Sequence, residues 1–117
     1  MKHQIFNYRI LESVYKEIKD GIKTIKFRLL NDKSKKTKNS DLIKFTVVNH
    51  ESKFINVKVV DKFIYNSIGE LWEDKNVIFN NTIKYTKQEF FKVFYNIFGK
   101  ENVGISKIVG IKFKLTD

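Results

Sequence analysis

Four stretches of the chain alternate apolar with polar side chains, and this pattern most constrains the fold. A period of two residues places one set of side chains on each face of a β-strand. In the third stretch Asp61 breaks the alternation, which indicates a β-bulge that lets Phe63 and Tyr65 continue it. The stretches are Lys23–Leu30, Leu42–Val48, Phe54–Tyr65 and Ile108–Leu115. The sequence therefore predicts a sheet as the centre of the fold.

Three helices are predicted outside these four stretches, one before the first of them and two between the last two. The first has an apolar stripe with helical spacing, and Gly21 stands where a left-handed C-cap ends a helix. Capping-box patterns at Ser67–Glu70 and Thr86–Glu89 open the other two, and Gly99 closes the last. The stripe of the first helix consists of Leu11, Val14, Tyr15 and Ile18.

The order of elements predicts the fold class. With a short strand at Gln4–Tyr8, it is strand, helix, three strands, two helices, strand. This order favours an α+β domain, a small curled β-barrel of about five to six mostly antiparallel strands with two to three helices at its ends. A length of 117 residues fits one domain, 1–117. Polar stretches at Lys33–Ser40, Asn49–Lys53 and Asp74–Tyr85 are interpreted as a surface loop, a hairpin turn and a second loop.

The positive charge is unevenly distributed along the chain. The chain carries 23 basic and 13 acidic side chains, a net charge of +10. Abundant lysine without alanine or proline is also typical of an AT-rich coding bias, so the total alone says little. Residues 1–60 hold 14 basic and 6 acidic side chains, whereas residues 61–117 hold 9 and 7. This asymmetry favours a positive face that binds an anionic partner.

The composition also excludes several classes of protein. The absence of cysteine excludes disulfides, thiol nucleophiles and thiolate zinc sites, and two histidines are too few for a metal cluster. We therefore expect no metal and no cofactor. No apolar run reaches the roughly 20 residues that span a bilayer, and the N-terminus lacks a signal sequence. We expect a cytoplasmic protein that does not bind membranes.

The candidate site lies on the strand that begins at Lys23. Lys26 and Arg28 are two residues apart and share a strand face with Thr24, which suits phosphate recognition. We interpret this as the solvent-facing side of the strand. Lys23 follows the first helix directly, where it either caps the helix or binds an anion in a cleft. Further candidates are Lys33, Lys35 and Lys36, which extend the positive charge, and Tyr65, which could stack on a base.

At this strand the chain resembles the ASCH domain, a branch of the PUA-like superfamily, in its small stand-alone bacterial or mobile-element form. The family signature Gly-x-Lys-x-x-Glu-x-Arg-Leu is similar to residues 21–29. Three further motifs resemble the family in the same order along the chain. They lie at Ser40–Phe45, Tyr65–Leu71 and Ile108–Leu115. The resemblance covers nearly the whole chain and implies a PUA-like fold with a ligand cleft beside the signature strand.

The chain departs from the family at positions that concern catalysis. Lys26 replaces the usual Glu, and Ser40 replaces a Gly. Some small bacterial members resemble amidohydrolases that deacetylate acetylated cytidine, with a site formed by the motif lysine, a threonine three residues later and a glutamate before the last helix. Lys23 matches the lysine, but Lys26 occupies the threonine position, and no acidic residue lies between Lys75 and Gln88. The resemblance therefore leaves enzymatic activity uncertain.

Three functions remain open from the sequence. The favoured one is binding of nucleic acid, as RNA or a modified nucleotide, in the cleft beside the signature strand. The second is a small hydrolase acting on a modified nucleoside or RNA, with Lys23 as its central catalytic residue. The third is a protein-interaction or regulatory module whose positive face binds an acidic protein partner.

Overall fold

The computed structural model describes residues 4–75 and 85–116. A five-stranded sheet in the order β1-β3-β4-β5-β2 forms its centre. Three neighbouring strand pairs are antiparallel, and β1 runs parallel to β3. The strands are β1 (Ile5–Ile10), β2 (Ile25–Leu29), β3 (Leu42–Val47), β4 (His50–Tyr65) and β5 (Ile108–Leu115). The α+β curled sheet expected from the sequence is confirmed.

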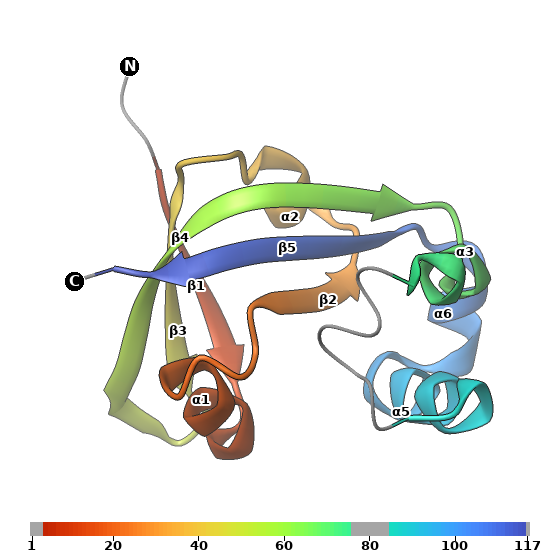
Figure 1. Ribbon diagram of the computed structural model, residues 1–117, viewed down its shortest axis with the longest axis horizontal. Coiled ribbons are helices and arrows are strands. Elements are labelled where there is room, and N and C mark those ends of the chain that lie inside the picture. Colours follow the sequence, from red (N-terminus) through yellow and green to blue (C-terminus); the bar gives the residue numbers. More distant parts are fainter. Residues whose placement is uncertain (1–3, 76–84, 117) are drawn as a thin grey trace.

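Helices lie at the two ends of the curled sheet. In Figure 1, α1 lies next to β1 and β3, whereas α3, α5 and α6 gather at the opposite end. The short helix α2 follows β2 along the chain. The helices are α1 (Glu12–Lys19), α2 (Asp32–Lys36), α3 (Ile68–Glu73), α5 (Lys87–Phe98) and α6 (Lys100–Ile105). No helix in the described ranges is long and apolar enough to cross a membrane.

The predicted local signals are largely present. Gly21, which follows α1, has φ +77°, and its N–H donates to the carbonyl of Ile18 in the last turn of the helix. Thr86 and Glu89 form the reciprocal capping box that opens α5. The register between β4 and β5 shifts between Val59 and Asp61, which confirms the bulge. These signals depend on neighbours in sequence, so they could be predicted without the tertiary structure.

The lysine-rich segment is not the surface loop that was expected. Asn31 opens α2 there with a capping box, because its side chain accepts from the N–H of Ser34 and the Ser34 hydroxyl accepts from the N–H of Asn31. Ser34 and Thr37 are fully buried. The ammonium of Lys62 on β4 donates to the carbonyls of Ser34, Lys35 and Thr37, at 2.9, 3.2 and 2.8 Å. A cation at the C-terminal end thus holds this short helix in place.

Other expectations need smaller corrections. The first strand extends to Ile10, and α6 was not predicted. The turn between β3 and β4 is shorter than Asn49–Lys53, because β4 already begins at His50. Ser40, which stands where the resembled family has Gly, has φ +76°, a left-handed conformation that glycine adopts without strain. The expected loop Asp74–Tyr85 lies mostly outside the described residues.

Two apolar clusters fill the two sides of β2. Ile25 and Phe27 belong to the cluster with α3, α5 and α6. The other cluster fills the concave side of the sheet and includes Phe45, Ile111 and Ile18 of α1. Strand β2 therefore has covered side chains on both faces, and no face of it is simply solvent-facing.

Gly110 permits this close packing, and its replacement by alanine is expected to destabilise the fold. Gly110 lies opposite Phe27 in the β2–β5 register, and a methyl group on it would lie 2.9 Å from Cε1 of that ring. Because the ring is held in a packed core, Gly110→Ala is expected to lower the free energy of unfolding by about 1–3 kcal/mol in urea titrations. The matched Gly104→Ala, with open space around it in α6, is expected to change it by less than about 1 kcal/mol. Equal stability of the two variants would contradict this packing.

Candidate anion-binding site

The basic side chains of β2 point into the concave side of the sheet. Lys26 pairs with Ile111 and Arg28 with Val109 in the β2–β5 register, and both partners belong to the concave cluster. Lys26 and Arg28 also lie with Tyr8 and Phe45 around a gap that is too narrow for a water molecule. Both are half-buried. The expectation of a solvent-facing basic side is therefore wrong, because the curl of the sheet turns this side of β2 inward.

Lys23 belongs to the same group of charges. Its backbone N–H donates to the carbonyl of Glu17, directly after α1. Its side chain is half-buried and lines a cavity of about 210 Å³ together with Thr24, between the end of α1 and β5. Lys23 lies near enough to Lys26 to lower the pKa of that amine. We call Lys23, Lys26 and Arg28 the concave cationic cluster.

Burial and mutual repulsion perturb the pKa values of this cluster. Burial, together with the smaller effects of the Lys23 and Arg28 charges, lowers the pKa of Lys26 to about 8, against an opposing effect of Glu17. Burial also lowers the pKa of Lys23 and of Arg28. Glu17 is the one carboxylate with a resolved effect on these lysines, and among the described residues it forms no ion pair with either. Three cations without a paired carboxylate among the described residues make this cluster a candidate site for an anionic ligand.

Tyr8 connects the cluster to α2. The Arg28 guanidinium carbon lies 4.6 Å from the centre of the Tyr8 ring, and the Lys33 ammonium lies 4.7 Å from it. Lys33 also donates to the carbonyl of Asn7, at 2.7 Å. The Tyr8 hydroxyl lies 3.3 Å from the hydroxyl of Thr37, the C-cap residue of α2. The ring of Tyr8 therefore bridges β1 to both β2 and α2 and fixes the positions of two cations.

A larger groove begins at this point. It has a volume of about 640 Å³, and Asn7, Arg9, Lys44 and Asn49 are among the residues that line it, along with Arg28 and Lys33. Four of its lining residues are cations, and Glu51 is the one carboxylate among them. We call it the edge groove, because it borders the edge strand β1. Arg28 lines both the edge groove and the narrow gap beside Lys26 on the concave side.

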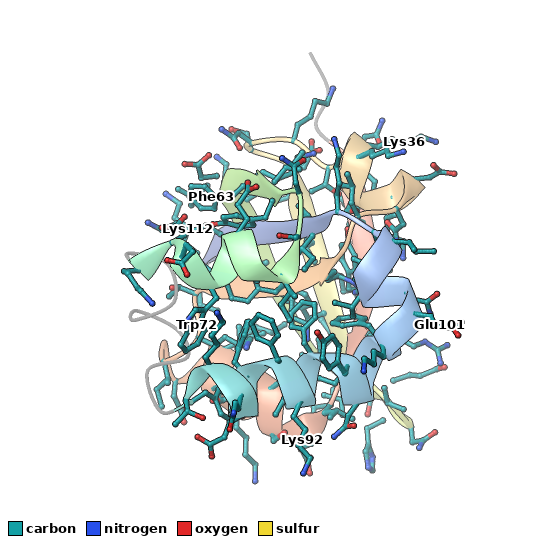
Figure 2. The ribbon with its side chains drawn as sticks, turned by 90° about the vertical axis from the view of Figure 1, so that its right-hand side faces the viewer. Lys36, Phe63, Trp72, Lys92, Glu101 and Lys112 are labelled. Carbon is teal, nitrogen blue, oxygen red and sulfur yellow. The ribbon has the colours of Figure 1, made fainter. Side chains whose placement is uncertain are left out.

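The other candidate residues lie apart from this centre. Lys35 and Lys36 are exposed on α2. Figure 2 shows Lys36 far from Lys92, which projects outward from α5. Tyr65 is buried in the cluster with α3 and α5, and its hydroxyl donates to Asp74, at 2.7 Å. Burial and Asp74 together raise the pKa of this phenol. The side chain of Tyr65 therefore shares a side of β2 with Ile25 and not with Lys26.

Sequence reasoning missed Tyr8, Arg9 and Lys44. The sequence contained one signal for Arg9, because it is one of only two arginines in the chain. In the structure both arginines line the edge groove. Its place beside Thr46 depends on the parallel pairing of β1 with β3, which no local pattern indicates. In the ranges that the structure covers, no group of three acidic or histidine side chains is placed to hold a metal.

Comparison with known proteins places this geometry in a known fold. No family model matches the sequence, and no curated protein sequence matches it. The hypothetical protein PH0355 matches in structure, with a TM-score of 0.76 and 25% identity, covering 97% of this chain and 99% of that one. PF0455 from Pyrococcus furiosus gives 0.67 and 22%, covering 100% and 99%.

ASCH domains are among the similar structures. The ASCH domain from Lactobacillus crispatus has a TM-score of 0.70 at 14% identity, covering 96% of this chain and 79% of that one. The ASCH protein from Zymomonas mobilis has a TM-score of 0.61 at 14% identity, covering 92% and 65%. The chain therefore has the ASCH-type fold that its four motifs indicated.

Proposed function

We propose that this protein binds RNA or a modified nucleotide through the concave cationic cluster. The observation that carries the proposal is the inward orientation of Lys23, Lys26 and Arg28, half-buried beside one another without a paired carboxylate in the described chain. A phosphate bound there would lower their repulsion and form charge-assisted hydrogen bonds. Arg28 offers a planar fork to two oxygens, and the two lysines add mobile ammonium groups.

The fold supports a ligand in this place. The cluster lies on the strand that carries the ASCH-like signature, at the concave side of the sheet. The cavity beside Lys23 lies between α1 and β5, and both polar and apolar side chains line it, as is typical of ligand sites. Lys26, which stands where the resembled hydrolases have a threonine, adds positive charge in place of a hydroxyl, and this favours binding over the hydrolase alternative.

Salt dependence tests the proposal. Fluorescence polarisation with a labelled single-stranded oligouridylate is expected to show binding at 50 mM KCl. If three phosphates are neutralised, affinity falls roughly 20-fold between 50 and 200 mM KCl, since the slope for single strands is about −0.7 per contact. Absence of binding at 50 mM KCl, or an affinity that does not change with KCl concentration, would overturn the proposed function. An acidic peptide that binds equally well would instead favour the protein-partner alternative.

A further inference from the structure

The edge groove contains charge that the concave cluster does not require. A single nucleotide on Lys23, Lys26 and Arg28 leaves Arg9 and Lys44 without a ligand. Yet Arg9 and Lys44 line the edge groove, which Arg28 also lines. Both arginines of the chain therefore lie at this groove. Arginine suits phosphate recognition better than lysine, because its fork binds two oxygens at once. This placement favours a ligand that continues past the cluster.

The pairing of three strands extends this surface onto the outer side of the sheet. In the registers of β1, β3 and β4, Asn7 lies beside Lys44 and Lys44 beside Asn56. In the next row, Arg9 lies beside Thr46 and Thr46 beside Phe54. Because alternate residues of a strand share a face, these two rows form one continuous polar and cationic surface around a single aromatic ring.

Phe54 is the aromatic ring on this surface. It is 44% exposed, and the ammonium of Lys44 lies 4.3 Å from the centre of its ring. An aromatic face with a cation beside it is what single-stranded nucleic-acid binders use, with the ring stacking on a base and the cation binding the adjoining phosphate. A charged groove alone would also fit an acidic protein, but an exposed ring beside Lys44, which lines the groove, favours a nucleobase.

Like charges face one another farther along the same side. Lys58 on β4 lies directly across from Lys114 on β5, and both are exposed. Cross-strand pairs of like charge destabilise a sheet unless an anion lies between them. Positive charge therefore continues beyond Lys44 on β4 and β5, next to Leu42 of β3, which pairs with Lys58.

From these observations we infer that the ligand is an extended single-stranded nucleic acid. One of its phosphates lies at the concave cluster, its backbone continues through the edge groove along Arg9 and Lys44, and one base stacks on Phe54. The inference rests on the proposed function and adds the class of ligand, a strand of several nucleotides rather than a mononucleotide.

Two probes of different length separate this inference from the proposed function. They are a uridine trinucleotide and a uridine octanucleotide, each titrated at 50 mM KCl by competition against a labelled octamer. The octamer offers about six registers to a three-nucleotide site, so register counting alone gives about a sixfold gain. Contacts in the edge groove are expected to raise the gain to 50-fold or more, since each added phosphate and stacked base contributes separately.

Variants of the edge groove assign the gain to residues. The double variant Arg9→Gln, Lys44→Gln is expected to weaken octamer binding about tenfold or more while leaving the trimer within about twofold. Phe54→Ala is expected to weaken octamer binding about fivefold or more, and Phe54→Tyr to retain it. These side chains are exposed or line the groove, so circular dichroism spectra of the variants are expected to match the native protein.

The results of these titrations distinguish a failure of the extended-strand inference from a failure of the proposed function. Trimer binding with only a register-counting gain for the octamer would overturn the extended strand and leave the proposed function intact. Loss of octamer affinity in Phe54→Tyr, equal to that in Phe54→Ala, would overturn base stacking. An octaglutamate peptide that binds as tightly as the octamer and depends equally on Phe54 would identify an acidic protein as the occupant and overturn the inference. If neither oligonucleotide binds, the proposed function itself fails.

Discussion

Arg28→Met is expected to weaken binding of single-stranded RNA about 10- to 100-fold, because a hydrogen bond to a charged partner contributes about 1.5–3 kcal/mol. Arg28 belongs to the concave cluster and to the edge groove at once, so its loss affects both parts of the binding surface. The slope of log affinity against log salt is expected to flatten by about 0.7 for each phosphate contact that is lost. Polarisation titrations at several salt concentrations measure both quantities.

Two variants serve as controls for Arg28. Arg28→Lys keeps the charge without the planar fork and is expected to have an affinity between those of the native protein and Arg28→Met. Lys92→Met removes one positive charge from the exposed side of α5, a helix that packs on the other side of β2 from Lys26, and is expected to leave affinity within about twofold. If Lys92→Met weakens binding as much as Arg28→Met, affinity depends on net charge alone and the located site is wrong.

Lys26→Met is expected to stabilise the fold while it weakens binding. The lysine side chain is half-buried beside two other cations, and its pKa is lowered from 10.5 to about 8. A lowering of this size corresponds to about 3 kcal/mol of destabilisation of the charged form in the folded state. Methionine fills similar space without charge. Thermal unfolding at pH 7 is therefore expected to show a higher midpoint for the variant, and RNA titration about tenfold weaker binding.

The effect of pH on Lys26→Met has a definite sign. The folded-state pKa of Lys26 lies below the unfolded-state value, so the unfolded chain binds more protons between pH 8 and 10.5. The native protein thus gains stability from Lys26 as pH rises through this window, and the advantage of the variant shrinks. Below pH 8 the advantage is constant. An advantage that grows above pH 8, or a variant less stable than the native protein at pH 7, would contradict the buried, repelled amine.

Local signals predicted much of the fold. The alternating stretches became β2 to β5, Gly21 ended α1 in a left-handed conformation, and the register shifts beside Asp61. These features depend on residues that are close in sequence, where propensity and capping act directly. The capping box at Asn31 follows the same rules, but the surrounding lysines are typical of a loop.

The site could be predicted only in part, because it depends on curvature and strand pairing. The sequence identified Lys23, Lys26 and Arg28 as one group, and the structure places them together. It did not show that the polar side of β2 turns inward, since alternation alone does not distinguish solvent from the concave side of a curled sheet. The sequence also did not show that Arg9 and Lys44 lie on one surface, because this arrangement requires the parallel pairing of β1 with β3.

The departures from the resembled family acquire a physical meaning in this structure. Lys26 stands where the family has Glu and makes the concave side more positive, beside Lys23 and Arg28. A glutamate there would form an ion pair with its neighbours and reduce the attraction for an anion. The substitution therefore agrees with a site that binds phosphate.

The titration of Lys26 with and without RNA tests the central claim most directly. The ¹³Cε resonance of Lys26, assigned with Lys26→Arg, reports its protonation by NMR. In the free protein the inflection is expected near pH 8. With saturating octauridylate, a phosphate beside the amine favours its charged form and is expected to raise the inflection by about one pH unit or more. An inflection that stays near pH 8 while the RNA is bound would contradict a ligand at the concave cluster.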